Sequence, residues 1–196
     1  MSPGDEKMSA ADMNKSVPEH YAPLAKWLHW IVALLVLAVI PMGIAMSNSD
    51  PGPAQDRLYL LHRSTGLVIL VLAILRLTVR VSHGAPAPYA GLTRFERIAS
   101  TATHHLLYLL LLLMPVVGWL MASAFGATTS FYGLFDVPNL VGKNEALFNV
   151  LNKAHKAGGI TMALLVLLIS GVALLELNHL IARRGYRASG GLMLLW

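Results

Sequence analysis

Histidines near the start of long apolar segments are the residues of this chain best suited to chemistry. His29, His62, His104 and His155 each lie near the N-terminal end of a different apolar segment. Ionisable side chains are costly inside a membrane, so a histidine there is by default a functional candidate. One histidine near the start of each segment predicts two sites, each holding a metal between two imidazoles.

The composition indicates that these segments cross a membrane. Of the 196 residues, 56% are hydrophobic and 13% are charged. A helix needs about 20 apolar residues to cross hydrocarbon, and it satisfies its own backbone there. We therefore expect an all-α integral membrane protein, a four-helix transmembrane up-down bundle. The expected spans are 25–47, 57–81, 95–123 and 154–182.

The distribution of charge predicts how the bundle sits in the membrane. Most of the 15 Lys and Arg residues precede the first span, lie in the second connection or follow the fourth span. The positive-inside rule then places the N- and C-termini in the cytoplasm. We expect one membrane domain, 21–185, between a mobile polar N-terminal tail, 1–20, and a C-terminal tail, 186–196. No cleavable signal peptide is expected, because the first tail lacks an apolar stretch.

The composition excludes several kinds of redox site and disfavours one class of protein. The chain has no cysteine, which excludes iron–sulfur clusters, thiolate-ligated haem and covalent haem attachment through C-x-x-C-H. A redox metal would have to be held by His, Met or carboxylate. The apolar composition disfavours a nucleic-acid-binding protein despite the net positive charge, so no nucleic acid is expected as a partner.

Alternating helix direction predicts which histidines pair. The first and third helices start inside and the second and fourth outside, so His29 lies level with a histidine of the third helix. His62 lies level with His155 on the outer side. Two levels with two imidazoles each suit two bis-histidine haems. The pairs would be diagonal in the bundle if neighbours in sequence are neighbours in space.

Glycines share a register with the outer pair. Gly66 lies four residues after His62, and Gly159 lies four residues after His155. Residues four apart share a helix face. A glycine there would leave room for a flat macrocycle, whereas close helix packing through small residues explains glycines without explaining their register with histidine.

A second glycine register concerns the inner pair. Gly43 lies fourteen residues after His29, and Gly118 lies fourteen after His104, which places each roughly 21 Å deeper, at the level of the opposite haem. The match favours His104 over the adjacent His105 as the third ligand, because neighbouring helical residues point about 100° apart. His105 stays the alternative.

Basic side chains are candidates for binding haem propionates. Arg76 lies on the face of His62 at the cytoplasmic level, and Arg63 flanks His62; the arginine fork binds carboxylates well. The alternative interpretation is that these side chains snorkel, so that their charged groups reach the membrane surface; it applies above all to Arg80 and Lys153.

The connection 124–153 is long and carries several aromatic residues. Aromatic residues gather at membrane interfaces, so we expect an interfacial segment on the outer leaflet. It could cap a site, dock a partner or cover the end of the bundle.

Several segments in order resemble the bacterial four-helix cytochrome b561 family, which includes the superoxide oxidase type. The matching pieces are WLHW, LHRSTGLVILVLAILRL, HHLLYLLLLLMPVVG, FYGLFDVP and KAHKAGG, and the resemblance covers roughly 20–185. The family's H-x3-Y spacing, with a proline eleven residues after the histidine, falls on His104, Tyr108 and Pro115. One departure concerns the last helix, where Gly171 and Asn178–His179 stand where many members have histidines.

The resemblance implies two b-type haems, held by His29, His62, His104 and His155, in the bacterial inner membrane. It implies electron transfer with ubiquinone as the membrane redox partner. Members similar to the superoxide oxidase oxidise periplasmic superoxide to oxygen and pass the electron to ubiquinone.

The function expected from the sequence is therefore that of a superoxide:ubiquinone oxidoreductase surrounded by membrane lipid. The alternative is a non-enzymatic cytochrome subunit that serves a periplasmic dehydrogenase or other redox protein. A transporter or a purely structural bundle would require the four histidines to be coincidental.

Overall fold

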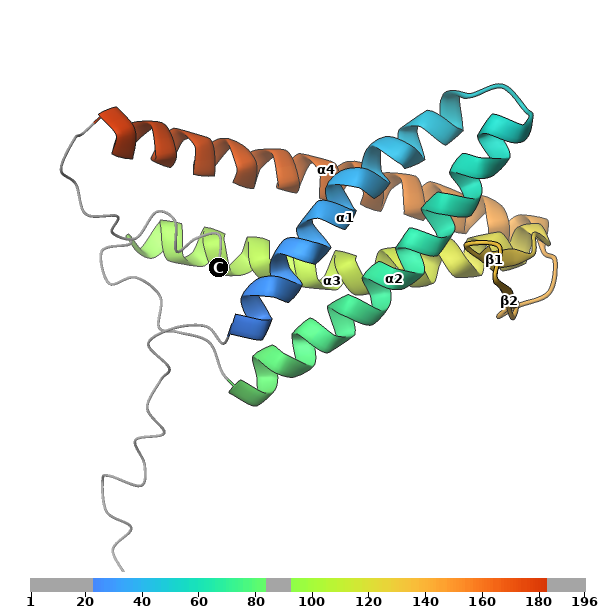
Figure 1. Ribbon diagram of the computed structural model, residues 1–196, viewed down its shortest axis with the longest axis horizontal. Helices are drawn as coiled ribbons and strands as arrows, with labels where there is room; N and C mark the ends of the chain where they lie inside the picture. Colours follow the sequence, from blue (N-terminus) through green and yellow to red (C-terminus); the bar gives the residue numbers. More distant parts are fainter. Residues whose placement is uncertain (1–22, 84–92, 183–196) are drawn as a thin grey trace, which may run out of the picture.

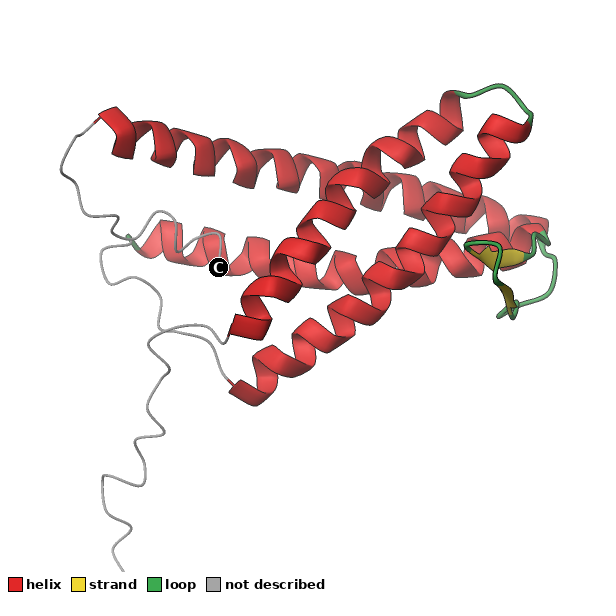
Figure 2. Cartoon of the chain, viewed as in Figure 1, coloured by secondary structure: helices red, strands yellow, loops and turns green. Residues whose placement is uncertain are grey.

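The computed structural model describes residues 23–83 and 93–182 and is built almost wholly of helix (Figure 2). All four helices in these ranges are long and apolar enough to cross a membrane, which confirms the predicted membrane bundle. The predicted tails, 1–20 and 186–196, lie outside the described residues. The elements in order are α1 (Pro23–Asn48), α2 (Pro53–His83), α3 (Arg94–Phe125), β1 (Thr129–Phe131), β2 (Phe135–Val137) and α4 (Glu145–Ala182).

The start of α4 differs from the prediction. The first three helices match their predicted spans to within a few residues, but α4 begins at Glu145 rather than at residue 154. Asn144 caps it, because its Oδ1 accepts a hydrogen bond from the Leu147 amide at 3.0 Å, as Asn does at helix N-termini. Hydropathy predicts only the membrane-spanning part of a helix. The first residues of α4 are too polar to be recognised by their hydropathy.

Both ends of α3 are fixed by local contacts. The side chain of Thr93 accepts from the Glu96 amide, and the Glu96 carboxylate accepts from the Thr93 amide, which makes a complete capping box. Gly126 ends the helix in the left-handed conformation at φ 86°, which glycine adopts without a steric penalty. These caps fix where α3 begins and ends, and the positions of His104 and Tyr108 along the bundle follow from them.

The four helices form two helical hairpins, α1–α2 and α3–α4, that cross each other. α1 packs along α2, and α3 packs along α4, while α2 also packs on α3. Figure 1 shows the α1–α2 hairpin running obliquely across the α3–α4 hairpin. α1 and α4 have almost no close backbone approach. The chain thus runs up and down as predicted, with α2 and α3 as the main link between the hairpins.

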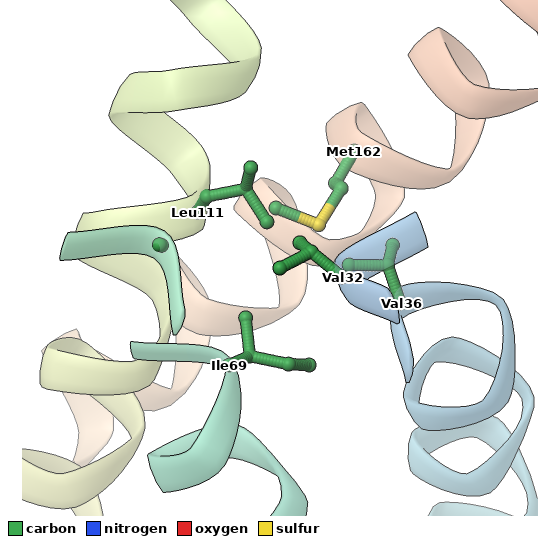
Figure 3. Close-up of a cluster of buried hydrophobic side chains, with 6 residues drawn as sticks. Val32, Val36, Ile69, Leu111 and Met162 are labelled. Carbon is green, nitrogen blue, oxygen red and sulfur yellow. The ribbon is translucent and has the colours of Figure 1, made fainter. Parts of the chain in front are cut away.

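An apolar layer lies between the two helical hairpins, near the middle of the helices. Its six buried residues come from all four helices, and five of them are labelled in Figure 3. Four of the six lie seven residues after one of the predicted ligand histidines: Val36, Ile69, Leu111 and Met162. Seven residues are two turns, or roughly 10 Å, so this layer separates the two histidine levels.

The connection between α3 and α4 contains a small antiparallel hairpin that the sequence did not predict. β1 pairs with β2 in the register Thr129↔Val137 to Phe131↔Phe135. At its turn Tyr132 has φ 50° and Gly133 has φ 76°, and the Leu134 amide donates to the Phe131 carbonyl at 2.9 Å. Two positive φ angles are what a type I′ turn requires. We call the end of the bundle that carries this hairpin the hairpin end, and the opposite one the far end.

Candidate functional site

His62 of α2 and His155 of α4 face each other at the hairpin end. Their ring centroids are 6.1 Å apart and the ring planes are inclined at 76°. A metal held by both rings needs a separation of roughly 6 Å, because each metal–nitrogen bond spans about 2 Å and each ring adds its own radius. The two residues come from different helical hairpins, which is the diagonal pairing that the sequence predicts.

A backbone carbonyl of α1 orients the His62 ring. His62 Nδ1 lies 3.1 Å from the carbonyl oxygen of Val39. A carbonyl oxygen only accepts, so Nδ1 carries the proton and donates, and Nε2 keeps its lone pair. Histidines that bind a metal through Nε2 typically donate their other ring N–H to a carbonyl or carboxylate in this way.

His155 has a similar setting on the other helical hairpin. Its Nδ1 is buried and makes no hydrogen bond of good geometry, while the Met114 backbone of α3 lies near enough to act on the ring. Val39 and Met114 both stand four residues before a glycine, Gly43 and Gly118 respectively. The two histidines thus lie against equivalent stretches of α1 and α3.

Those two glycines provide the space that the histidine rings occupy. A Cβ atom at Gly43 would lie 3.0 Å from Cε1 of His62, and one at Gly118 would lie 3.0 Å from Cε1 of His155. The sequence placed both glycines at this level, in contact with a macrocycle. The structure gives them a more direct neighbour, because each approaches the imidazole of the adjacent helix.

The glycines that follow the histidines are less crowded. A Cβ at Gly66 would meet nothing within 4 Å, and one at Gly159 would only reach the Met114 methyl at 4.0 Å. Gly158, which the sequence analysis missed, packs tightly on Met114. The surroundings of Gly66 are thus open, and room there for a flat group stays a prediction.

The second pair lies at the far end. His104 of α3 and Arg76 of α2 are both within electrostatic range of His29 of α1. His104 is half-buried and donates from Nδ1 to the Ser100 carbonyl at 2.8 Å, again leaving Nε2 available. His105 makes the same type of bond within its helix but is exposed. The geometry favours His104 over His105 as the partner of His29; its role as a ligand stays a prediction.

Both candidate arginines stack on tyrosine rings. The Arg76 guanidinium carbon lies 4.9 Å from the centroid of Tyr108, and Arg80 lies 5.6 Å from the same ring. At the hairpin end Arg63 lies 5.2 Å from the ring of Tyr59 and within electrostatic range of His62. Each candidate arginine is therefore beside a histidine pair, in a position from which a carboxylate at that level could be bound.

The hairpin is anchored to α2 beside His62. The Tyr132 amide donates to Ser64 Oγ at 2.8 Å, and Ser64 Oγ donates to the Ser130 carbonyl at 3.2 Å. The Tyr132 hydroxyl lies 3.0 Å from Thr65 Oγ1. Ser64 and Thr65 are buried. The connection 124–153 thus covers this end of the bundle rather than only lying along the outer leaflet.

A second set of contacts holds the rest of the connection to α3. Buried Ser123 accepts from the Leu140 amide at 3.1 Å, and the Trp119 indole donates to the Pro138 carbonyl at 3.0 Å. The Asn144 amide donates to the Ala124 carbonyl at 2.8 Å. The connection is therefore fixed on α2 through its hairpin and on α3 through the residues that follow the hairpin.

The residues that hold this cover were not among those predicted from the sequence: Ser64, Thr65, Ser123 and Tyr132. The available signal was a Ser-Thr pair directly after His62 and Arg63 within an apolar segment, where hydroxyls need partners. The side chain of His179 lies outside what the structure describes.

The donor sets suit a haem. Within 23–83 and 93–182 no group of three or more His, Asp or Glu side chains comes together, whereas zinc and non-haem iron sites draw three or four ligands from such side chains. A haem supplies four nitrogens itself and needs few ligands from the protein; His62 and His155 would hold it, and their separation fits such a role. The fold and the site define the class as a polytopic membrane electron-transfer cytochrome.

Known proteins place the chain within this class. The family model for prokaryotic cytochrome b561 matches residues 20–183, so the chain belongs to the prokaryotic cytochrome b561 family. Members bind haem b and transfer electrons in the membrane. With its four spans, the protein is a multi-pass protein of the bacterial inner membrane.

Three curated relatives agree with this assignment. Cytochrome b561 homolog 2 of Escherichia coli K12 is 31% identical over 124 residues, which are 63% of this chain and 66%, just under two thirds, of that relative. Cytochrome b561 homolog 1 of the same organism is 27% identical over 134 residues, 66% of this chain and 74% of the relative. The probable superoxide oxidase CybB of Yersinia pestis is 25% identical over 135 residues, 69% of this chain and 76% of the relative.

Proposed function

We propose that this protein binds two b-type haems and moves single electrons between the hairpin end and ubiquinone. The observation that carries the proposal is the His62–His155 ring separation of 6.1 Å between two different helical hairpins. The proximity of His29 and His104 supports a second site of the same kind at the far end.

The hairpin end is the periplasmic side in this proposal. Ten of the 15 Lys and Arg residues precede or begin α1, lie toward the α2–α3 connection, or follow α4, whereas five lie toward the hairpin end. An excess of basic residues marks the cytoplasmic side. Both termini are then cytoplasmic.

The protein's own residues prepare the site in three ways. His62 offers Nε2 as an axial ligand while its Nδ1 proton is held by the Val39 carbonyl, which raises the basicity of the ligand. The apolar layer of Val36, Ile69, Leu111 and Met162 excludes water from the space between the two histidine levels. A haem bound between each histidine pair supplies one-electron redox chemistry, and its potential depends on such ligands and burial.

Superoxide is the electron donor in the sharper form of the proposal. The Yersinia pestis relative is named a probable superoxide oxidase. Arg63, Lys153 and Lys156 flank the two histidines of the hairpin end, and clustered positive charge attracts small anions and raises their association rate. Oxidation of superoxide yields oxygen and one electron, and two such electrons with two protons reduce ubiquinone to ubiquinol.

The test is stopped-flow mixing of purified, oxidised protein with superoxide, with and without ubiquinone. Fast reduction of the haem bands, followed by their reoxidation only when ubiquinone is present, is the expected result. Haem bands that superoxide leaves unchanged would contradict the superoxide assignment.

A non-enzymatic cytochrome subunit is the second candidate. Leu134 and Phe135 at the hairpin are 77% and 59% exposed, as docking residues for a periplasmic redox protein would be. This function predicts a normal b-type spectrum, no response to superoxide, and haem reduction only after a partner dehydrogenase and its substrate are added.

A further inference from the structure

Tyr132 has a backbone conformation that its side chain does not favour. Among the described residues it is the only one other than glycine with a positive φ angle, 50°. Bulky side chains are rare in this region, and such conformations persist where surrounding contacts hold them. Asn, Asp or Gly would fit this turn position with less strain. The turn alone therefore does not explain why a tyrosine stands here.

Two contacts to α2 hold Tyr132 in this conformation. Its amide donates to Ser64 Oγ at 2.8 Å, and its hydroxyl is 3.0 Å from Thr65 Oγ1. Ser64 has no exposed surface and Thr65 is 7% exposed. These bonds are costly to break on the α2 side, because the buried hydroxyls of Ser64 and Thr65 would lose a partner without gaining water, whereas Tyr132 itself is 39% exposed.

The hydroxyl contact is on the face of α2 that carries His62. Thr65 lies three residues after His62, and Gly66, beside which a Cβ would find open space, lies four residues after it. Residues three and four apart share a helix face. The phenol of Tyr132 therefore contacts α2 within one helical turn of His62.

We propose that Tyr132 is a positioning residue that latches the β1–β2 hairpin over the hairpin-end histidine pair and so limits access of water and small solutes to it. The proposal rests on the proposed function only in treating that pair as a redox site. Ser64 anchors the backbone of the latch and Thr65 anchors its hydroxyl. Tyr132 acts through the hairpin and not by binding a metal.

The absence of cysteine gives a direct test of the latch. Thr129 of β1 is 2% exposed, so Thr129→Cys in the full-length, haem-loaded protein places a single thiol beneath the hairpin. Its labelling rate by a water-soluble maleimide reports how often the hairpin opens. Tyr132→Phe should raise this rate about three- to tenfold, the effect of losing one hydrogen bond. Ser64→Ala, which loses two hydrogen bonds to the hairpin, should raise it at least as much.

Thr78→Val is the matched control, because Thr78 is an exposed residue of α2 whose hydroxyl bonds only within its own helix. It should leave the labelling rate unchanged. Tyr132→Asn separates the turn from the hydroxyl, since Asn tolerates positive φ but lacks the phenol. The Thr129→Cys protein should be labelled faster with Tyr132→Asn than without it. Slower labelling would show that turn geometry holds the hairpin and would overturn the proposal. A labelling rate in Tyr132→Phe equal to that of the control would overturn it too.

A second readout tests access to the site. Reduction of the haem bands by a water-soluble reductant should contain a phase that His62→Ala removes, and Tyr132→Phe should accelerate this phase by a similar factor. Faster labelling without faster reduction would mean that the hairpin opens without limiting access, which overturns the proposal. Failure of the proposed function has a separate signature, because a protein without a haem spectrum still gives the labelling comparison.

Discussion

The two ends of the bundle carry similar histidine pairs but surround them differently. At the hairpin end, His62 and His155 lie against helix backbone at glycines, and a β-hairpin is bonded to the buried hydroxyls of Ser64 and Thr65, two and three residues after His62. At the far end, His29 and His104 lie near Arg76, which stacks on Tyr108. Described residues thus give one pair a polar cover and the other a positive neighbour. The difference indicates that access is controlled at one end and the electrostatic field at the other.

Removal of a ligand should have the largest effect and should separate the two ends. Changing His62 or His155 to Ala should abolish the hairpin-end haem and spare the other, because each site depends on its own pair. Changing His29 or His104 should do the reverse. Haem content and redox titration of the purified variants measure this.

His105→Ala is the control for this experiment, because His105 is exposed and should leave both haems in place. If His105→Ala removes the far-end haem while His104→Ala retains it, the assignment of the third ligand is wrong.

The apolar layer between the ends should be the next most sensitive region. Leu111→Ala removes a buried side chain that is 7% exposed, and such truncations cost about 2–5 kcal/mol. Both haem sites should lose stability together, because the layer contacts both helical hairpins. Thermal loss of the haem bands measures this, with Leu109→Ala, on the exposed face of α3, as the control. A loss confined to one haem would mean that the layer does not couple the two ends.

A methyl group at Gly43 should disturb the hairpin end alone. The added Cβ would meet His62 Cε1 at 3.0 Å, and overpacking of this kind costs about 1–3 kcal/mol. We expect Gly43→Ala to alter the spectrum of the hairpin-end haem and to weaken its retention. Gly171→Ala is the control, because a Cβ there meets nothing within 4 Å; equal spectra for the two variants would contradict the close approach.

Neutralising Arg76 should affect only the far end, and by the smallest amount. Arg76→Gln removes a positive charge near His29. This change lowers the electrostatic free energy of the oxidised haem more than that of the reduced haem, because the oxidised form is the more positive. The far-end midpoint potential should fall by on the order of 40 mV, since 59 mV is a tenfold change for one electron. Redox titration measures the shift, and an equal fall at the hairpin-end haem would show that the charge does not belong to one site.

Sequence periodicity predicted much of this molecule because the membrane imposes simple rules. Apolar length predicted the four helices, alternating helix direction predicted that His62 and His155 lie at one level, and helical spacing predicted the level of Gly43. Contacts between segments distant in the chain were not predictable in this way. The hold of Ser64 on Tyr132, and the cap that starts α4 at Glu145, depend on how the connection folds back. Neither has a periodic signal.

The packing of the helices in two pairs also bears on how the protein is assembled. Each helical hairpin, α1–α2 and α3–α4, has extensive internal packing, whereas the two are joined mainly through α2 and α3. Each proposed haem would take one ligand from either hairpin, as His62 and His155 illustrate. The cofactor would then act as a cross-link between the two helical hairpins, and the supply of haem would set when the newly made chain becomes a single rigid body.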